Sequence, residues 1–430
     1  MSVIPARKAG PQPRRGAPAQ PHWQRRHSFG FRVATLAFVV NMAFSGVPTP
    51  LYVLYQRRDH FSTIMLTVIY AVFAAGVIAS LFLGGHLSDW VGRKRVFVPA
   101  LLLNVACSLI FLFAPSLPGL LVARIVSGVS IGLTTATATA YLTELHLATS
   151  RGAAGSPRRA QIIATAANLG GIGVGPLVGG LLAQYAPLRL RLPYIVLLVA
   201  LSVLAVLVAV APETAELPDP RPRYRPQRIT VPEHARAQFF MATATGLASF
   251  AVFGMFNSLA PSFLAGTLHE SSHAVAGAVA FAAFAAGAVA QIALSRAGLA
   301  RTLRTAPLVL IPGLALLAGG MWLSSLAMFV AGGVLTGAGA GLTFRGALTA
   351  TGAAAPPESR AEAMAFFFLG GYIGVALPAV GLGIATQYVS TRVVMLVFVV
   401  IVGAAITLGA RTLRARHVRD GAEFSQIRHT

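Results

Sequence analysis

The chain reads GGHLSDWVGRKR over residues 84–95, a short charged loop between two long apolar segments. Its fixed positions follow the pattern Gly-x-x-x-Asp-x-x-Gly-Arg-Lys, which runs from Gly85 through Asp89 and Gly92 to Arg93 and Lys94. At average residue usage, roughly 10⁻³ such matches are expected by chance in a chain of this size. The loop therefore carries information about the fold, and so do the two long apolar segments that it joins.

The composition is that of a membrane protein. Hydrophobic residues make up 56% of the chain and charged residues 11%, with a mean hydropathy of +0.72, whereas a soluble domain carries about 25% charged residues. The net charge of +22 comes almost entirely from Arg in short loops and tails beside apolar segments. This is not the clustered basic face of a nucleic-acid-binding protein, so we expect a lipid bilayer as partner and no nucleic acid.

The apolar segments predict twelve transmembrane helices, each about 20 residues long. Their expected ranges are 33–55, 62–84, 96–114, 118–144, 160–185, 192–211, 238–262, 273–295, 305–323, 325–351, 361–386 and 390–411. The predicted fold is an all-α integral membrane protein of two six-helix bundles. The expected divisions are a disordered basic N-terminal tail (1–31), an N-terminal bundle (32–211), a Pro- and Arg-rich cytoplasmic linker (212–236), a C-terminal bundle (237–412) and a cytoplasmic C-terminal tail (413–430).

The basic residues lie mostly on one side of these predicted helices. Twenty-seven Arg and Lys fall in the tails, the linker and the loops on their side, and five fall on the other side. Basic loops stay in the cytoplasm, so both termini are expected there, which requires an even number of spans. The first 31 residues lack the apolar core of a signal peptide. We expect a multi-pass protein of the cell (inner) membrane.

The two halves of the chain are repeats of each other. The segment AVFAAG at 71–76 matches AAFAAG at 282–287, an offset of 211 residues. The pair Gly128 and Gly132 matches Gly337 and Gly341 at an offset of 209, and LGG at 169–171 returns at 369–371. Matches in the same order at nearly constant offset predict that the two bundles are pseudo-symmetric.

The charged loop and the repeat together resemble the major facilitator superfamily of secondary transporters, whose signature loop joins helices 2 and 3. The resemblance implies two bundles that give alternating access to a substrate site near the bilayer midplane. It also implies a conformational latch made by Gly85, Asp89, Gly92, Arg93 and Glu144. In this latch Asp89 faces the N-terminus of helix 11, where free N–H groups favour an anion, and Arg93 reaches Glu144.

Two positions depart from the pattern of this superfamily. Trp90 stands where a second basic residue is usual, which removes part of the charge network. In the second half, the repeat places Ala300 at the position of Asp89. We therefore expect a single latch.

Arg124 lies inside the predicted fourth helix, in the pattern Arg124-x-x-x-Gly128-x-x-x-Gly132. An arginine at membrane depth is costly and faces the protein interior or water. The segment resembles the superfamily's helix 4 motif, whose arginine is associated with proton transfer. The alternative is that Arg124 bonds main-chain carbonyls of the first helix near Pro48. No acidic residue lies at mid-membrane in the predicted helices, so Asp89, Arg124 and Glu144 are the candidates for proton coupling.

The fifth predicted helix carries Gly171, Gly175, Pro176, Gly179 and Gly180 in the pattern Gly-x-x-x-Gly-Pro-x-x-Gly-Gly. Small residues let a neighbouring backbone approach, and a proline inside a helix removes a hydrogen bond and bends it. The pattern resembles the motif of the drug:proton antiporter branch of the superfamily, which implies export. The alternative is a packing seam of small residues, which explains the glycines but not the proline.

Candidates for the substrate cavity are polar side chains inside the predicted helices. They are Asn41, Tyr52, Tyr70, Arg124, Asn168, Asn257 and Arg345. The three asparagines serve equally well as hydrogen-bonding groups between helices, and Arg345 is suited either to an anionic substrate or to extending toward the cytoplasmic surface. The third, sixth, ninth and twelfth helices are the most uniformly apolar and are expected to face lipid.

These features support two main hypotheses. The first is a secondary active transporter that couples export of small organic compounds, lipophilic neutral or anionic, to protons. The second is an uptake carrier, a symporter or uniporter, for a small neutral or anionic metabolite, which the lack of a mid-membrane acid favours. A transporter-like membrane sensor needs a larger soluble domain than the linker and tails provide.

An enzyme is not expected from this sequence. It contains no metal-ligand spacing, phosphate-binding loop or nucleophile–base set. We therefore expect no cofactor and no metal, and a chain that works as a monomer on a small-molecule substrate and protons.

Overall fold

The computed structural model describes residues 22–149, 157–215, 232–258, 260–356 and 360–427. Within these ranges the chain is helical, and twelve segments are long and apolar enough to cross a membrane. The predicted class and number of spans are confirmed. The N-terminal half contains α1 (His22–Gly46), η1 (Thr49–Leu51), α2 (Tyr52–Asp59), α3 (Thr63–Gly84), α4 (Leu87–Val91), α5 (Arg93–Phe113), α6 (Leu117–Thr149), α7 (Pro157–Tyr185) and α8 (Leu192–Val210).

The C-terminal half repeats this order of long helices. It contains α9 (Glu233–Ser258), α10 (Ala260–Gly266), α11 (His273–Ala293), α12 (Leu299–Trp322), α13 (Leu326–Ala354), α14 (Arg360–Ala385) and α15 (Thr391–Ile427). α1 begins earlier and α15 ends later than predicted, and the first predicted helix (33–55) is divided into α1, η1 and α2. Residues 22–31 and 413–427, which we assigned to the tails, are helical because neither stretch contains a proline to stop the helix.

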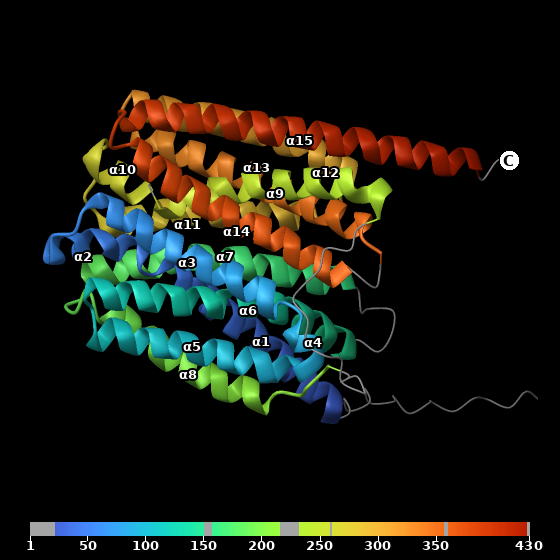
Figure 1. Cartoon of the computed structure of the whole chain (residues 1–430), viewed down its shortest axis with the longest axis horizontal. Coiled ribbons are helices and arrows are strands. Elements are labelled where there is room, and N and C mark those ends of the chain that lie inside the picture. The colour runs from blue at the N-terminus through green and yellow to red at the C-terminus, as the bar shows by residue number, and fades with distance from the viewer. Residues whose placement is uncertain (1–21, 150–156, 216–231, 259, 357–359, 428–430) are drawn as a thin grey trace, which may run out of the picture.

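Two hydrophobic cores underlie the two bundles. One core is made almost entirely of residues between Val33 and Val208, and the other of residues between Ala248 and Ile406. In Figure 1 the first half of the chain (blue to green) and the second half (yellow to red) accordingly form two adjacent groups of helices. The groups meet along α7 against α11 and α3 against α14, so a site between the bundles draws on these four helices.

The internal repeat is visible in how the helices pack. Within the first bundle, Gly128 of α6 lies against the main chain of α3 at Gly76. In the second bundle, Gly337 and Gly341 of α13 lie against the main chain of α11 near Gly287. The sequence match aligned these same segments, so the small residues are repeated because each bundle needs the same close helix pair.

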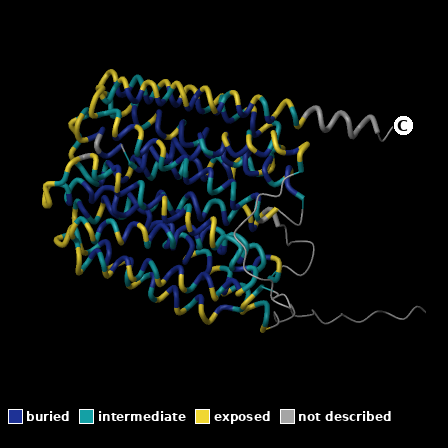
Figure 2. Tube along the Cα trace, viewed as in Figure 1, coloured by how far each residue is buried: buried dark blue, intermediate teal, exposed yellow. Residues whose placement is uncertain are grey.

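The outer surface of the bundles is apolar. Exposed side chains on α8 include Val199 and Val206, and on α15 they include Val400 and Ile401. Figure 2 shows the exposed residues along the outside of the helices and the buried ones toward the interior. This arrangement agrees with the expectation that the sixth and twelfth spans face lipid.

Candidate functional site

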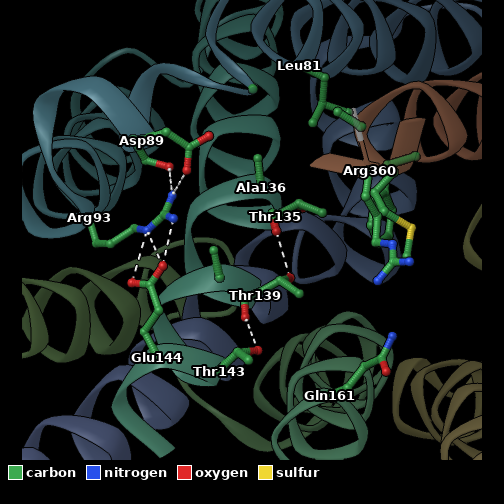
Figure 3. A pocket seen from close by; sticks show the side chains of 16 residues that line it. Leu81, Asp89, Arg93, Thr135, Ala136, Thr139, Thr143, Glu144, Gln161 and Arg360 are labelled. Atoms are coloured by element: carbon green, nitrogen blue, oxygen red, sulfur yellow. Dashed lines mark hydrogen bonds and ion pairs between the residues drawn. The ribbon is translucent and has the colours of Figure 1, made fainter. Parts of the chain in front are cut away.

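A cleft of about 450 Å³ lies between the two bundles at the end of the protein where α1 starts and α15 finishes, here named the termini end. One wall is formed by α3, α4 and α6, and the opposite wall by the first turns of α14. Figure 3 shows Asp89, Arg93 and Glu144 gathered on one wall, with Arg360 across the cleft from them. The predicted latch residues therefore meet at a boundary between the bundles.

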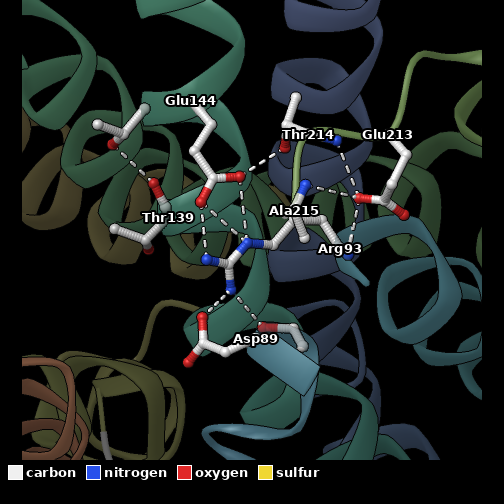
Figure 4. Close-up of polar contacts among 9 residues, drawn as sticks. Asp89, Arg93, Thr139, Glu144, Glu213, Thr214 and Ala215 are labelled. Carbon is white, nitrogen blue, oxygen red and sulfur yellow. Dashed lines mark hydrogen bonds and ion pairs between the residues drawn. The ribbon is translucent and has the colours of Figure 1, made fainter. Parts of the chain in front are cut away.

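Arg93 is the centre of a charge cluster in this wall (Figure 4). Its Nη2 lies 2.7 Å from Glu144 Oε1, and its Nη1 lies 2.5 Å from Asp89 Oδ1. Nη1 also donates to Ser88 Oγ at 2.8 Å. The contact between Arg93 and Glu144 was predicted from the sequence and is confirmed. A guanidinium bonded by two carboxylates holds the ends of α4, α5 and α6 together, since charge-assisted hydrogen bonds are the strong ones.

Gly92 allows the turn between α4 and α5, and Glu213 binds the free N–H groups at the start of α5. Gly92 joins α4 to α5 with φ +114°, a conformation that side-chain-bearing residues rarely adopt. Glu213, from the segment after α8, accepts the N–H groups of Arg93 and Lys94 at 2.9 and 3.1 Å. A carboxylate at the start of a helix satisfies free N–H groups and the helix dipole, and a Cβ at Gly92 would lie 2.9 Å from Glu213 Oε2.

The segment after α8 is the part of the site that our sequence reasoning missed. Thr214 Oγ1 donates to Glu144 Oε2, so both Glu213 and Thr214 hold the cluster. In the sequence, an acid and a hydroxyl directly follow Pro212 at the end of an apolar span, and this pattern was the sign that the segment has polar partners. We had assigned them to the linker because a linker composition predicts no contacts.

Asp89 was expected to face the N-terminus of α14. Among the described residues its ion pair is with Arg93, and the termini-end cleft lies between it and Arg360 at the start of α14. The expected contact of Asp89 with α14 is therefore not made in this structure. The physical reason is that the bundles stand apart at this end, which leaves Asp89 on the cleft wall.

A small chamber of about 30 Å³ lies deeper between the bundles. Its walls are mainly aromatic and apolar and come from both halves: Ser45, Phe73, Leu169, Ile172, Phe250, Phe253, Gly254, Asn257, Phe284, Tyr372 and Val375. Toward the termini end, the hydroxyls of Tyr372 and Thr135 lie 3.2 Å apart and join the bundles. Asn257 is the one predicted cavity residue that lines this chamber.

The opposite end of the protein, here named the far end, is joined by a polar contact between the bundles. Tyr70 Oη donates to the main-chain oxygen of Asn257 at 2.5 Å, and Thr49 Oγ1 donates to Asn257 Oδ1 at 3.0 Å. Beyond it lies a far-end cleft of about 330 Å³, lined in part by Tyr70 and Ser258. This contact lies between the chamber, which Asn257 lines, and the far-end cleft, which Tyr70 lines.

Arg124 is fully buried in the first bundle, behind this contact. Its Nη1 donates to the main-chain oxygen of Ser45 at 2.9 Å, near the end of α1, as the structural alternative predicted. The guanidinium carbon lies 4.7 Å from the ring centre of Phe73 and 5.5 Å from that of Tyr52. Aromatic faces partly stabilise this cation, which has no ion pair with a carboxylate in the part of the chain that the structure describes. A proton-coupling role for Arg124 stays a prediction.

The glycines of the α7 motif lie on two faces of the helix. Gly171 and Gly175 face the main chain of α1, Gly179 faces the main chain of Val47 directly after α1, and Gly180 faces the main chain of α11 at His273. A Cβ at Gly175 or Gly180 would overlap a main-chain oxygen, so close packing alone accounts for these residues. Pro176 lies inside α7 and packs against Gly46 at the end of α1. The motif thus joins α7 to both bundles.

Three predicted cavity residues lie inside the first bundle instead. Asn41 is fully buried, donates to Thr134 Oγ1 at 2.8 Å and accepts from Asn104 Nδ2 at 2.9 Å. Asn168 Nδ2 lies 3.6 Å from Met42 Sδ, and Tyr52 packs against Tyr70. Each of these side chains contacts a neighbouring helix of its own bundle, and none of them is among the lining residues of the chamber or of the two clefts described above, so their role in a substrate cavity stays a prediction. Tyr70 and Arg345, in contrast, do line clefts between the bundles.

Comparison with known proteins identifies the family. The sequence profile of the Major Facilitator Superfamily matches residues 34–323. The chain belongs to the Major Facilitator Superfamily. It is therefore a multi-pass membrane transporter of small molecules, and superfamily members are in general transporters, not enzymes. Among the described residues, no group of three or more His, Cys, Asp and Glu is arranged to hold a metal ion.

Similar proteins place the chain within the superfamily only broadly. A curated relative, "Putative polyol transporter 2" of Arabidopsis thaliana, is 27% identical over 139 residues, which is 32% of this chain and 27% of that protein. The alignment thus spans about a quarter of that relative's length. The fold resembles three solved transporter structures at sequence identities that show the fold alone.

The solved structures cover nearly the whole chain. The human organic anion transporter MFSD10 (TETRAN) has a TM-score of 0.65 and 18% identity over 92% of this chain and 100% of its own. The nucleoside transporter NupG has a TM-score of 0.61 and 12% identity over 90% and 99%. A bacterial homologue of the human lysosomal transporter Spinster, solved inward-facing and unoccupied, has a TM-score of 0.62 and 16% identity over 92% and 98%.

Proposed function

We propose that this superfamily member is a proton-coupled exporter of small organic compounds, lipophilic neutral or anionic, that works by alternating access. The observation that carries the proposal is the asymmetry between the two ends. The cleft at the termini end is the larger, about 450 Å³ against about 330 Å³ at the far end, and the far end is joined by two hydrogen bonds to Asn257, from Tyr70 and Thr49, whereas one hydroxyl contact, Thr135 with Tyr372, joins the bundles on the termini side of the chamber. Rocking of the bundles about the aromatic chamber would exchange the open and closed ends.

The proposed orientation places the termini end in the cytoplasm of the cell that carries this membrane. Twenty-seven basic residues belong to that side and five to the other, and basic loops are retained in the cytoplasm. The termini-end cleft is then the cytoplasmic entrance. We expect a monomer, because the two bundles of one chain enclose the chamber without a second copy.

Export and proton coupling are supported by two features. The first is the pattern of Gly171, Gly175, Pro176, Gly179 and Gly180 on α7, which matches the antiporter-like motif at every fixed position. The second is Asp89, a carboxylate on the wall of the cleft whose charge is compensated by Arg93. Protonation of Asp89 would weaken that ion pair and change the latch, which links a proton to the conformation of the bundles.

The second candidate function is an uptake carrier. It is favoured by the lining of the chamber, which contains no acidic residue in the described part of the chain. The names of the polyol and nucleoside transporters are compatible with this alternative, and the name of the organic anion transporter supports an anionic substrate.

The test uses inside-out membrane vesicles with an acidified lumen and a pH-sensitive dye inside. A panel of lipophilic neutral compounds and aromatic acids is added, and the wild type is compared with Asp89→Asn. Asp59→Asn is the matched control, since Asp59 pairs with Arg58 at the far end, away from the cleft. Compound-dependent loss of luminal protons that Asp89→Asn abolishes and Asp59→Asn preserves is the expected result.

A different outcome selects the alternative function. If labelled compounds equilibrate across the membrane without any proton movement, the chain is a facilitated carrier and the antiporter proposal fails. Proton movement that follows the compound in the same direction would identify a symporter.

A further inference from the structure

The outer surface of the second bundle includes α12 and α15, which pack against each other. In Figure 1, α15 lies along the edge of the second group of helices and finishes at the termini end. Near that end the two helices share a small buried cluster that contains Leu303 of α12 and Ala410 and Leu413 of α15. The start of α12 therefore lies beside the last part of α15, and the side chains that both helices expose there belong to adjoining surfaces.

On α12, one exposed stripe changes from apolar to basic toward the termini end. Leu308 and Ile311 are 66% and 44% exposed. Arg301 and Arg304 are exposed as well, near the start of the helix. Residues three and four positions apart share one face of a helix, so these four side chains form a single stripe.

The surface of α15 changes in the same way. Ile401 and Leu408 are 60% and 63% exposed, and Arg411 and Arg414 are exposed beyond them. The change from Leu408 to Arg411 takes about 5 Å along the helix axis, less than one turn. Exposed apolar side chains suit the lipid tails, and arginines suit the headgroup region of a bilayer. On both helices the change therefore marks the depth of the headgroups.

Arg301, Arg304, Arg411 and Arg414 together form a basic surface, here named the α12–α15 surface. None of the four takes part in an ion pair among the described residues. α12 contains no acidic residue, and neither does the part of α15 from 391 to 417. Like charges on neighbouring helices repel each other, so an anion bound at this surface lowers their electrostatic energy.

The internal repeat shows what this surface lacks. At the offset of 211 residues, Arg304 corresponds to Arg93 of the first bundle, which two carboxylates hold. The positions that correspond to those two acids are Ala300, at the same offset, and Ala353, at the offset of 209. The second bundle thus keeps the arginine but has neither acid, so a negative charge for it has to come from outside these positions.

We propose that the α12–α15 surface binds the phosphate headgroup of an anionic membrane phospholipid. The guanidinium groups of Arg304 and Arg411 hold the phosphate oxygens, since arginine binds phosphate through two parallel N–H donors. The acyl chains lie along the apolar parts of the two stripes, at Leu308 and Leu408. This continuity favours a lipid over a soluble anion, because a soluble anion makes no use of the apolar stripes.

All four arginines belong to the second bundle. A bound headgroup therefore contacts one bundle alone, and the site does not depend on which end of the space between the bundles is open. A ligand that binds both conformations equally shifts neither of them. The binding is thus separate from transport, and its test needs no transport substrate.

The test measures thermal unfolding of the purified full chain in a neutral detergent while phosphatidylglycerol is added to the micelles. Phosphatidylcholine with the same acyl chains, and inorganic phosphate without lipid, are titrated in parallel. The test variant combines Arg304→Gln and Arg411→Gln, one from each helix. The matched control combines Arg25→Gln and Arg26→Gln, which removes the same charge from exposed positions of α1. A third variant, Arg304→Lys with Arg411→Lys, keeps the charge.

We expect phosphatidylglycerol to raise the unfolding temperature of the wild type, the matched control and the lysine variant, and phosphatidylcholine and inorganic phosphate to leave it unchanged. An arginine near the membrane surface contributes about fivefold in affinity for an anionic lipid. The apparent dissociation constant for phosphatidylglycerol should therefore rise roughly 25-fold in the glutamine pair of α12 and α15. If this double variant does not fold, Arg411→Gln alone decides, with an expected rise of about fivefold.

Three results would overturn the proposal. Equal stabilisation by phosphatidylglycerol and phosphatidylcholine would show that the headgroup charge is not recognised. Equal stabilisation by inorganic phosphate would assign the surface to a soluble anion. An equal loss of affinity in the Arg25 and Arg26 control would show that the overall charge of the chain, and not the α12–α15 surface, attracts the lipid.

Discussion

Arg93 and Glu144 form a two-point ion pair between α5 and α6, in which Nη2 lies 2.7 Å from Oε1 and Nε lies 3.2 Å from Oε2. The pair is mostly shielded, since the Arg93 side chain is 11% exposed. Breaking a shielded pair leaves an uncompensated charge, which costs more than losing an exposed pair. The latch is therefore a structural element as well as a candidate switch.

The first prediction concerns this pair. Glu144→Gln keeps the shape of the side chain but removes its charge, so Arg93 retains Asp89 as its one carboxylate among the described residues. We expect the free energy of unfolding to fall by about 1–2 kcal/mol, discounted for the partial exposure of Glu144. Thermal unfolding in detergent measures it. Asp59→Asn, in an exposed pair at the far end, should change the value by less than about 0.5 kcal/mol, and equal losses would contradict the argument.

The second prediction concerns Glu213. Glu213→Ala removes the acceptor for the N–H groups of Arg93 and Lys94 at the start of α5. A lost cap of this kind costs about 1 kcal/mol, so amide hydrogen exchange at these two residues should accelerate roughly fivefold. Glu233→Ala is the control, because the Glu233 side chain is 87% exposed at the start of α9. Unchanged exchange in Glu213→Ala would show that the cap contributes nothing.

The third prediction uses the glycines of α7. Gly175→Ala places a methyl group against the main-chain oxygen of Ala43, whereas Gly170→Ala has no atom within 4 Å of the new methyl. We expect Gly175→Ala to lose about 1–3 kcal/mol through overpacking, and Gly170→Ala to be neutral or slightly stabilising. Unfolding temperatures of the two variants provide the comparison. A stable Gly175→Ala would mean that α1 and α7 separate easily.

The fourth prediction concerns the far-end contact. Tyr70→Phe keeps the ring but removes the bond from Tyr70 Oη to Asn257. Loss of one hydrogen bond should raise the population with an open far end by about two- to tenfold. The readout is the rate at which a membrane-impermeant maleimide labels Ser258→Cys, in a chain whose single cysteine is replaced by Cys107→Ser.

Tyr388→Phe is the control for this measurement. Tyr388 is 83% exposed, so its hydroxyl closes no gap between the bundles. The maleimide should label Ser258→Cys at the same rate with and without the Tyr388→Phe substitution. If Tyr70→Phe labels no faster than Tyr388→Phe, the far end is closed by packing and not by this hydrogen bond.

The sequence predicted the parts of the site that depend on neighbours along the chain. The charged loop between the second and third spans and the repeat are local patterns, and the pair of Arg93 with Glu144 was expected from the superfamily that this loop resembles. Glu213 and Thr214 were not found, because their partners Arg93, Lys94 and Glu144 lie far away in the chain. Nothing in the residues around them distinguishes a solvated side chain from one that completes a site.

The sequence by itself determined that the chain crosses a membrane twelve times in two related halves, since apolar length and repetition are properties of consecutive residues. Only the tertiary structure decided which polar groups face the space between the bundles. Asn41 and Asn257 look alike in sequence, yet one is buried within a bundle and the other lines the chamber. The physical reason is that the rotation of each helix about its axis is set by packing against neighbours, here through glycine contacts that one sequence does not reveal.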